Sequence, residues 1–216
     1  MTVGIIRVLT SDDQDFVDTH GRIIQDEFGL DFVARCIPDQ SLGIHSDDTF
    51  NLAVPKIVEL GKKLVDEFEV SSIFVSCAAD PGVAELRAEL SVPVVGAGSS
   101  GAFIALACAT KVGVLGITDE VPVAVSSLLG DRLVAALVPD GVQNTVDLMT
   151  PEGRTAALRA GETLKAQGAT CILFACTGLT TIGLRPELAT QLGIPVVDAV
   201  LAGGSVLQHV EVFSRP

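Results

Sequence analysis

The chain contains no tryptophan and no tyrosine, and its aromatic fraction is 4%. Hydrophobic residues nevertheless make up 48% of the 216 positions, so a buried core must consist mainly of Val, Ile, Leu and Ala. Cores of this composition are typical of parallel β-sheets that helices cover on both faces. The length suffices for one large domain or two smaller ones. The composition therefore favours the α/β class.

Positive charge is also scarce. The chain has 14 Lys and Arg residues against 27 Asp and Glu residues, which gives a formal net charge of -13. Nucleic acids and anionic membrane surfaces bind proteins through basic faces that displace counterions. We therefore expect a small-molecule partner, with no binding to nucleic acid or to a membrane.

No segment has the character of a membrane span or of a secretory signal. The longest charge-free run, residues 90–110, is divided by Pro93 and three glycines into a strand, a turn and a helix. The N-terminal sequence MTVGIIRVLTSDD has no cationic segment before its short apolar stretch. We therefore expect a cytoplasmic protein.

The cysteines lack the spacing of a metal site. Five are present, at positions 36, 77, 108, 171 and 176, with neither a C-x-x-C motif nor a Cys/His zinc pattern. An odd number at irregular spacing is typical of free thiols in a reducing compartment. Cys171 and Cys176 fall at an odd offset on one predicted strand, which puts them on opposite faces and prevents their pairing. We predict free thiols and no metal.

Short Val/Ile-rich runs alternate with longer segments of helical periodicity, and this order occurs twice along the chain. Strands separated by helical crossovers indicate parallel sheets. The predicted strands are residues 3–10, 31–37, 71–77 and 92–95 in the first half, and 112–118, 132–138, 171–176 and 194–198 in the second.

The two halves also match in detail. VGIIRVLTSDD resembles VGVLGITDE, IFVSC resembles ILFAC, and ELRAELSVPVVGAG resembles ELATQLGIPVVDAV, in the same order. We predict two similar α/β lobes related by a pseudo-twofold, each with a mostly parallel four-stranded sheet and helices on both faces. Residues 1–97 and 205–216 would form the first lobe, and residues 98–204 the second. A single doubly wound sheet is the alternative.

The stretch GAGSSG, residues 96–101, satisfies G-x-G-x-x-G, and Asp119 follows about 20 positions later. This pattern raises the hypothesis of a nicotinamide enzyme. However, its counterpart in the second half, DAVLAGG, lacks the glycine spacing, and the first strand of the chain does not carry the fingerprint. We interpret GAGSSG as a crossover between lobes, and we predict Asp119 in the first turn of the following helix.

Cys77 and Cys176 occupy the same place in this alignment, at the end of the third strand of each half. Ligands of parallel sheets bind beyond the carboxyl ends of the strands, so the two thiols are predicted to face one interlobe cleft. Two facing thiols can invert a carbon centre, one removing a proton and the other delivering one. The following helix ends are expected to lower the pKa of each thiol toward neutrality.

The segment around Cys77, SCAADPGVAELRAELSVPVVGAG, resembles the hydantoin racemase branch of the aspartate/glutamate/hydantoin racemase superfamily. The resemblance implies a cofactor-independent two-base racemase with two lobes, an interlobe site and frequent homo-oligomers. It nominates Cys77 and Cys176 as the catalytic acid/base pair. The remaining residues that it implies for substrate binding are Thr10 and Thr118, which would line the pocket, and the backbone of Ala78, Ala79, Thr177 and Gly178.

Several alternatives stay open. The reaction could be that of an aspartate/glutamate racemase or of a maleate-isomerase-like enzyme, and two lobes around a cleft also describe small-molecule-binding proteins. Arg7 lies within an apolar strand, where it could attract an anionic substrate or pair with an acid of the other lobe. His45 could close over the site from a long loop or lie on the surface. His20 and His209 receive no role.

Overall fold

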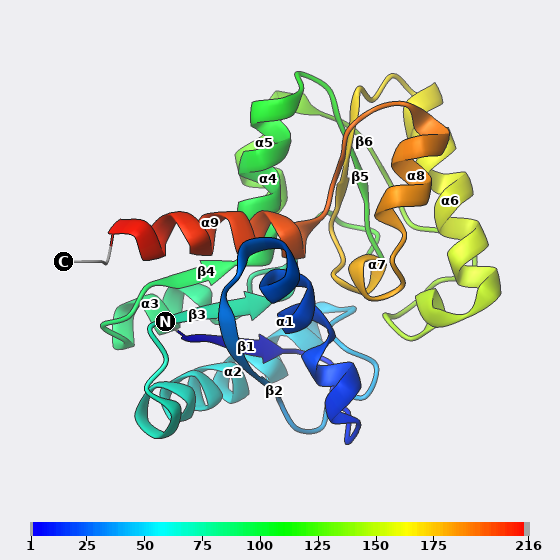
Figure 1. Cartoon of the computed structure of the whole chain (residues 1–216). Coiled ribbons are helices and arrows are strands. Elements are labelled where there is room, and N and C mark those ends of the chain that lie inside the picture. The colour runs from blue at the N-terminus through cyan, green and yellow to red at the C-terminus, as the bar shows by residue number, and fades with distance from the viewer. Residues whose placement is uncertain (1, 214–216) are drawn as a thin grey trace.

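The computed structural model describes residues 2–213, which form two four-stranded sheets with every strand pair parallel (Figure 1). The first sheet has the order β2-β1-β3-β4 and the second has the equivalent order β6-β5-β7-β8. This confirms the predicted two-lobe α/β fold, and the single doubly wound sheet is wrong. The strands of the first sheet are β1 (Thr2–Arg7), β2 (Asp31–Cys36), β3 (Ser72–Ser76) and β4 (Val94–Gly96). Those of the second are β5 (Val112–Leu115), β6 (Leu133–Leu137), β7 (Cys171–Phe174) and β8 (Val196–Val197).

Helices cover both faces of each sheet, as the Val/Ile-rich central strands require. Side chains of β1 alternate accordingly: Ile5 packs toward α1 and α9, and Ile6 packs toward α2 and α3. The first sheet is covered by α1 (Gln14–Phe28), α2 (Asp47–Phe68), α3 (Val83–Glu89) and α9 (Ala199–Phe213). The second is covered by α4 (Ala97–Cys108), α5 (Val123–Leu129), α6 (Pro151–Ala166) and α8 (Arg185–Leu192). Three shorter turns complete the second lobe: α7 (Gly178–Thr181), η1 (Gly130–Arg132) and η2 (Asp147–Met149).

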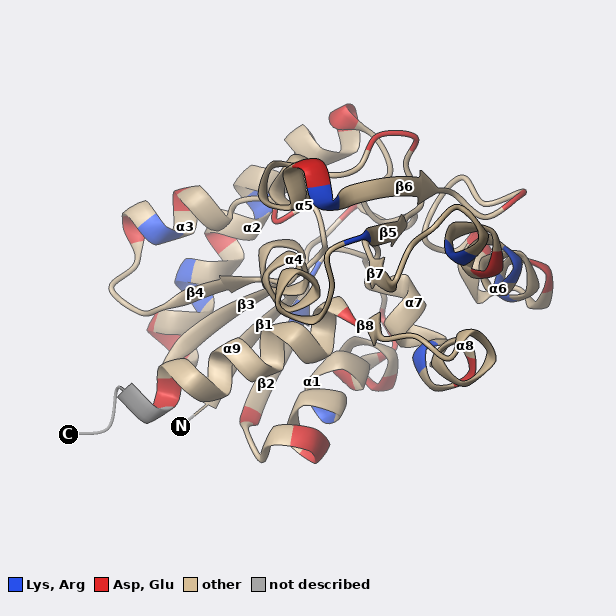
Figure 2. Ribbon diagram, turned by 90° about the horizontal axis from the view of Figure 1, so that it is seen from above, with Lys and Arg blue, Asp and Glu red and all other residues tan. Residues whose placement is uncertain are grey.

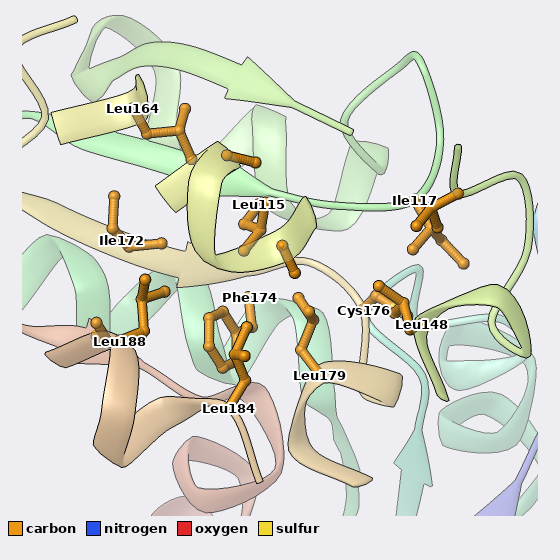
Figure 3. Close-up of a cluster of buried hydrophobic side chains, with 14 of the residues drawn as sticks. Leu115, Ile117, Leu148, Leu164, Ile172, Phe174, Cys176, Leu179, Leu184 and Leu188 are labelled. Atoms are coloured by element: carbon orange, nitrogen blue, oxygen red, sulfur yellow. The ribbon is translucent and has the colours of Figure 1, made fainter. Parts of the chain in front are cut away.

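The hydrophobic core of the second lobe includes the side chain of Cys176. Leu115, Ile172 and Phe174 of the sheet pack with side chains of α6 and α8 in one buried cluster (Figure 3). Cys176 lies at the end of this cluster, near Ile117 and Leu148. One side of its thiol therefore contacts hydrophobic atoms instead of water.

Charged residues lie mostly on the outer helices and loops, whereas the strands are largely free of them (Figure 2). Helix α4 carries no charge at all, which fits its place between α5, α9 and strand β7. Within residues 2–213 no helix is both long and apolar enough to cross a membrane.

Helices α4 and α9 connect the two lobes. Helix α4 leaves strand β4 of the first sheet and packs against β7 of the second, while α9 leaves β8 and packs against α1, β3 and β4 (Figure 1). Each lobe thus ends with a helix that lies against the other lobe's elements. The predicted boundaries at 97/98 and 204/205 stay a prediction; residues 1 and 214–216 of the predicted first lobe lie outside the described part of the chain.

A carboxylate accepts hydrogen bonds from the first turn of each of these connecting helices. Asp80 accepts hydrogen bonds from the backbone N–H groups of Gly98 (2.6 Å) and Ser99 (2.9 Å), which places GAGSSG at the start of α4 instead of in a phosphate-binding turn. A side chain at position 98 would collide with the carbonyl oxygen of Ala78, so glycine permits this close approach. Asp198 accepts equivalent bonds at the start of α9.

Candidate active site

A cavity of about 440 Å³ lies between the lobes, at the carboxyl ends of the central strands. Its walls come from the segments that follow β1, β3, β5 and β7, together with the loop that precedes α2. Parallel strands bring their carboxyl ends to one edge of a sheet, so two such edges facing each other enclose a site. The volume is within the range of small-ligand pockets.

Cys77 and Cys176 both line this cavity, one from each lobe. Cys77 follows the last residue of β3, and Cys176 stands two residues beyond the last residue of β7. The two residues are 8% and 7% exposed, so each thiol is largely buried, and both residues line the cavity. The predicted convergence of these two residues on one cavity is thus present in the structure.

The protonation state of the thiols differs from the sequence-based expectation. Burial, with a smaller contribution from the nearby Cys176, raises the pKa of Cys77 to about 12 from an ordinary value of 9.0. Burial likewise raises the pKa of Cys176 to about 11. The expected lowering toward neutrality was wrong, because desolvation of the thiolate outweighs the stabilising backbone N–H groups. Both sulfurs are neutral thiols near pH 7.

The backbone N–H groups after each cysteine divide into two kinds. Gly178 N–H donates to the sulfur of Cys176 at 3.4 Å, and the N–H of Ala79 lowers the pKa of Cys77 in the same manner. The N–H groups of Ala78 and Thr177, by contrast, have no acceptor within residues 2–213. All four of these residues line the cavity, so each lobe offers one free donor beside its thiol.

Arg7 forms part of the cavity wall and is only 4% exposed. Its Nη1 donates to the carbonyl oxygens of Phe16 and Val17, both at 3.1 Å, and its guanidinium lies 5.1 Å from the ring centroid of Phe16. No Asp or Glu in the described part of the chain forms an ion pair with it. The interlobe acid considered as an alternative partner is therefore absent from residues 2–213.

The two predicted threonines have different positions. Thr118 lines the cavity, and its hydroxyl donates to the carbonyl of Glu120 at 2.7 Å. Thr10 does not line it, contrary to expectation. The Thr10 hydroxyl instead donates to the carbonyl of Ile37 (2.6 Å) and accepts from the N–H of Gln40 (2.8 Å), so it holds two loops of the first lobe together.

Two further residues line the cavity that the sequence had not assigned to it: Asp119 was predicted in a helix, and His45 was left either over the site or on the surface. Asp119 was predicted in the first turn of a helix, but α5 begins only at Val123, and Asp119 lines the cavity from the preceding loop. His45 also lines the cavity, and its Nδ1 is buried without a hydrogen-bond partner in the described chain. A long loop therefore contributes to the site.

His20, to which the sequence gave no role, connects the lobes behind the cavity wall. Its Nδ1 lies 2.7 Å from the hydroxyl of Ser76, and its Nε2 lies 2.8 Å from the hydroxyl of Thr181 in the other lobe. Burial and the neighbouring Arg7 lower the pKa of His20 well below 6.5, so the ring is neutral. The available signal was a histidine on the buried stripe of α1, beside Val17 and Ile24.

We expect His20→Leu to lower the free energy of unfolding by about 2–4 kcal/mol, because the hydroxyls of Ser76 and Thr181 lose their shared partner in a buried place. His20→Asn, which can still reach one hydroxyl, should lose less. Urea denaturation measures both. Because the pKa of His20 is depressed, its contribution is present above about pH 6.5 and is lost as the pH falls below it. A leucine variant whose unfolding free energy follows the same pH dependence as the wild type would contradict this role.

Two lobes of parallel sheet on either side of a shared cavity define a class of cleft-binding α/β proteins. Within that class, the sequence model of the Asp/Glu/Hydantoin racemase family matches residues 18–205. The chain therefore belongs to this family, and racemases are isomerases.

Solved structures agree in fold. Allantoin racemase from Klebsiella pneumoniae superposes with a TM-score of 0.84 at 20% identity, covering 98% of this chain and 88% of that one. Glutamate racemase from Thermus thermophilus gives 0.69 at 18%, with 98% and 81% covered. Arylmalonate decarboxylase gives 0.68 at 16%, with 100% and 94% covered. No curated protein sequence matches significantly. At such low identities the likeness shows the fold alone.

Proposed function

We propose that the protein is a two-base racemase or epimerase, in which Cys77 and Cys176 invert a stereocentre alpha to a carbonyl group. One observation carries the proposal: two thiols from equivalent positions of two equivalent lobes line the same cavity. A single buried cysteine is commonly a structural residue. A pair related by the internal repeat and facing one cavity is what inversion of a carbon centre requires.

The proposed reaction needs one thiolate and one thiol. The thiolate takes the α-proton, the electron pair of the C–H bond moves into the carbonyl group, and an enolate forms. The thiol on the opposite face then returns a proton to the same carbon. Protons and charge balance, since the pair begins and ends with one proton between two sulfurs. The reverse reaction exchanges the two roles, and no cofactor takes part.

The free N–H groups of Ala78 and Thr177 suit the developing negative charge. They lie beside the two thiols and have no partner in the described chain, so they are available to donate to an enolate oxygen. Donors that are fixed in place before the reaction stabilise a transition state without reorganisation. The free donors beside both thiols fit the proposed exchange of roles between the cysteines.

A substituted hydantoin or an amino-acid derivative fits the site best. The cavity of about 440 Å³ accommodates a small ring with one substituent. The Cys-x-x-Asp-Pro-Gly motif at Cys77 is the hydantoin-type form, and the allantoin racemase that shares the fold acts, by its name, on a 5-substituted hydantoin. We propose a carbon acid of this group as the substrate, either a 5-substituted hydantoin or an amino-acid-type compound.

Incubation of enantiopure compounds in deuterated water tests the function. Allantoin, 5-methylhydantoin, aspartate and glutamate are followed by optical rotation and by loss of the α-proton NMR signal, with enzyme-free samples as background. At least one compound should lose optical activity and gain deuterium at the same carbon. Absence of both changes, together with a ligand-dependent rise in melting temperature, would instead favour a binding protein.

A further inference from the structure

Arg7 is a buried cation with which no carboxylate of the described chain forms an ion pair. It is 4% exposed, and no carboxylate within residues 2–213 pairs with it. Burial of an unpaired charge is costly, and proteins ordinarily compensate it with an opposite charge. The two carbonyl oxygens that Arg7 contacts are neutral dipoles and leave its net charge uncompensated. A bound anion in the cavity would compensate the buried charge of Arg7.

Two nitrogens of the Arg7 guanidinium have no protein acceptor among the described residues. Its two hydrogen bonds both involve Nη1, which leaves Nε and Nη2 without protein acceptors among the described residues. Neither nitrogen is among the fully buried atoms without a partner, which within residues 2–213 are His45 Nδ1 and Ser72 Oγ. The remaining donors therefore keep contact with solvent. Arg7 is also one of the residues that line the cavity, so a ligand bound there lies next to this residue.

Arg7 is also held close to the residues that carry the thiols. It pairs in register with Ser76 of β3, and Cys77 follows Ser76 directly. Arg7 and Ser76 therefore stand side by side at the carboxyl edge of the first sheet, and both line the cavity. The contacts with Phe16 and Val17 fix the guanidinium against α1.

We propose that Arg7 is an anion subsite and that the substrate is a carbon acid bearing a carboxylate. This inference rests on the proposed racemase function and narrows its substrate class to ring-opened or side-chain acids, as opposed to neutral hydantoins. A guanidinium presents paired N–H donors that match the two oxygens of a carboxylate. Removal of the α-proton from a carboxylate-bearing substrate adds a second negative charge, which the cation of Arg7 offsets.

The overall charge of the protein makes this subsite necessary for such a substrate. The chain has a formal net charge of -13, and the exposed acids Asp119 and Glu120 also line the cavity. Without a local cation these charges would disfavour an anionic ligand. Arg7 is the only Lys or Arg among the described residues that line the cavity.

N-carbamoyl-alanine and 5-methylhydantoin form a matched pair of probes, because ring closure of the first gives the second and removes its carboxylate. Calorimetry should show that the wild type binds N-carbamoyl-alanine and that Arg7→Met weakens this binding about 10- to 100-fold. Binding of 5-methylhydantoin should change less than about threefold. Arg7→Lys, which keeps the charge, should retain part of the affinity.

Arg35 provides the control variant. It lies on the neighbouring strand β2, stacks on Phe68 at 5.0 Å as Arg7 does on Phe16, and does not line the cavity. Arg35→Met removes the same charge and should leave binding of both probes unchanged. Wild-type protein with ¹⁵N-labelled arginine gives a readout independent of folding defects: one side-chain signal, absent in Arg7→Lys, should shift with N-carbamoyl-alanine and stay in place with 5-methylhydantoin.

The outcomes separate the subsite from the racemase function. Equal affinity of the wild type and Arg7→Met for N-carbamoyl-alanine, or binding of 5-methylhydantoin alone, would overturn the anion subsite even if hydantoins racemise. Arg7-dependent binding without α-proton exchange of any carbon acid would keep the subsite and overturn the racemase.

Discussion

Replacement of Cys176 by serine should slow racemisation by about 10²- to 10⁴-fold, which is the range typical of losing a positioned acid/base group. Cys77 would remain able to remove the α-proton from the enantiomer that presents it to that side of the cavity. With no thiol on the opposite face, the proton returns to the face it left. The variant should therefore exchange deuterium into one enantiomer without inverting it, and Cys77→Ser should do so with the other.

This experiment is measured by ¹H NMR and optical rotation on each enantiomer of the best substrate, in deuterated water. Cys108→Ser is the control, because Cys108 is exposed and does not line the cavity, and its activity should equal that of the wild type. Racemisation that survives in the double variant Cys77→Ser/Cys176→Ser would exclude the two-thiol mechanism.

The second large effect is a steep dependence of kcat/KM on pH. Both thiols are neutral in the free enzyme, with pKa values of about 12 for Cys77 and about 11 for Cys176. The active form carries one thiolate, and its fraction rises tenfold for each pH unit below the lower pKa of the pair. We expect kcat/KM to rise about 10³-fold between pH 7 and pH 10, since kcat/KM reports groups of the free enzyme.

Initial rates across this range check the expectation, with enzyme-free rates subtracted because alkali also racemises carbon acids. Circular dichroism at each pH excludes unfolding as the cause of a change. A plateau reached below pH 8 would mean that one thiol titrates near neutrality, and the role of burial in setting its pKa would be wrong.

A high thiol pKa also has a chemical consequence. It lowers the population of the thiolate near neutral pH, but the thiolate that does form is a stronger base toward a weakly acidic C–H bond. The burial that raises both pKa values also limits the solvation of each sulfur, and a poorly solvated setting strengthens the interaction of an enolate with the free N–H groups of Ala78 and Thr177. The greater basicity of each thiolate thus offsets part of the rate that is lost because only a small fraction of the thiols is ionised.

The internal repeat allowed the fold to be predicted in detail. Short Val/Ile-rich runs indicate strands. Because these runs occur twice in the same order along the chain, they predicted two equivalent sheets, and both sheets are present in the structure. Equivalence of position also brought Cys77 and Cys176 to one cavity, because strand ends of parallel sheets share an edge. The predicted homo-oligomer stays a prediction.

Tertiary contacts decided the rest. Thr10 was predicted as the last residue of the first strand, but β1 ends at Arg7, and the Thr10 hydroxyl binds Ile37 and Gln40, two partners that no local pattern predicts. The thiol pKa values depend on how completely neighbouring elements enclose each sulfur, which is a property of the packed lobes and not of the helix ends beside the cysteines.

The sequence by itself was sufficient to predict two similar α/β lobes and to single out Cys77 and Cys176 as residues at equivalent positions in them. Both predictions use periodicity and repetition, which can be read directly along the chain. Only the tertiary structure decided that His20 joins Ser76 to Thr181 across the lobes and that Arg7 lacks an acid partner within residues 2–213. Both facts depend on which polar groups meet after distant segments have packed. Hydrogen bonds between such distant polar groups form only when whole helices and strands pack against one another, so a local sequence pattern cannot predict them.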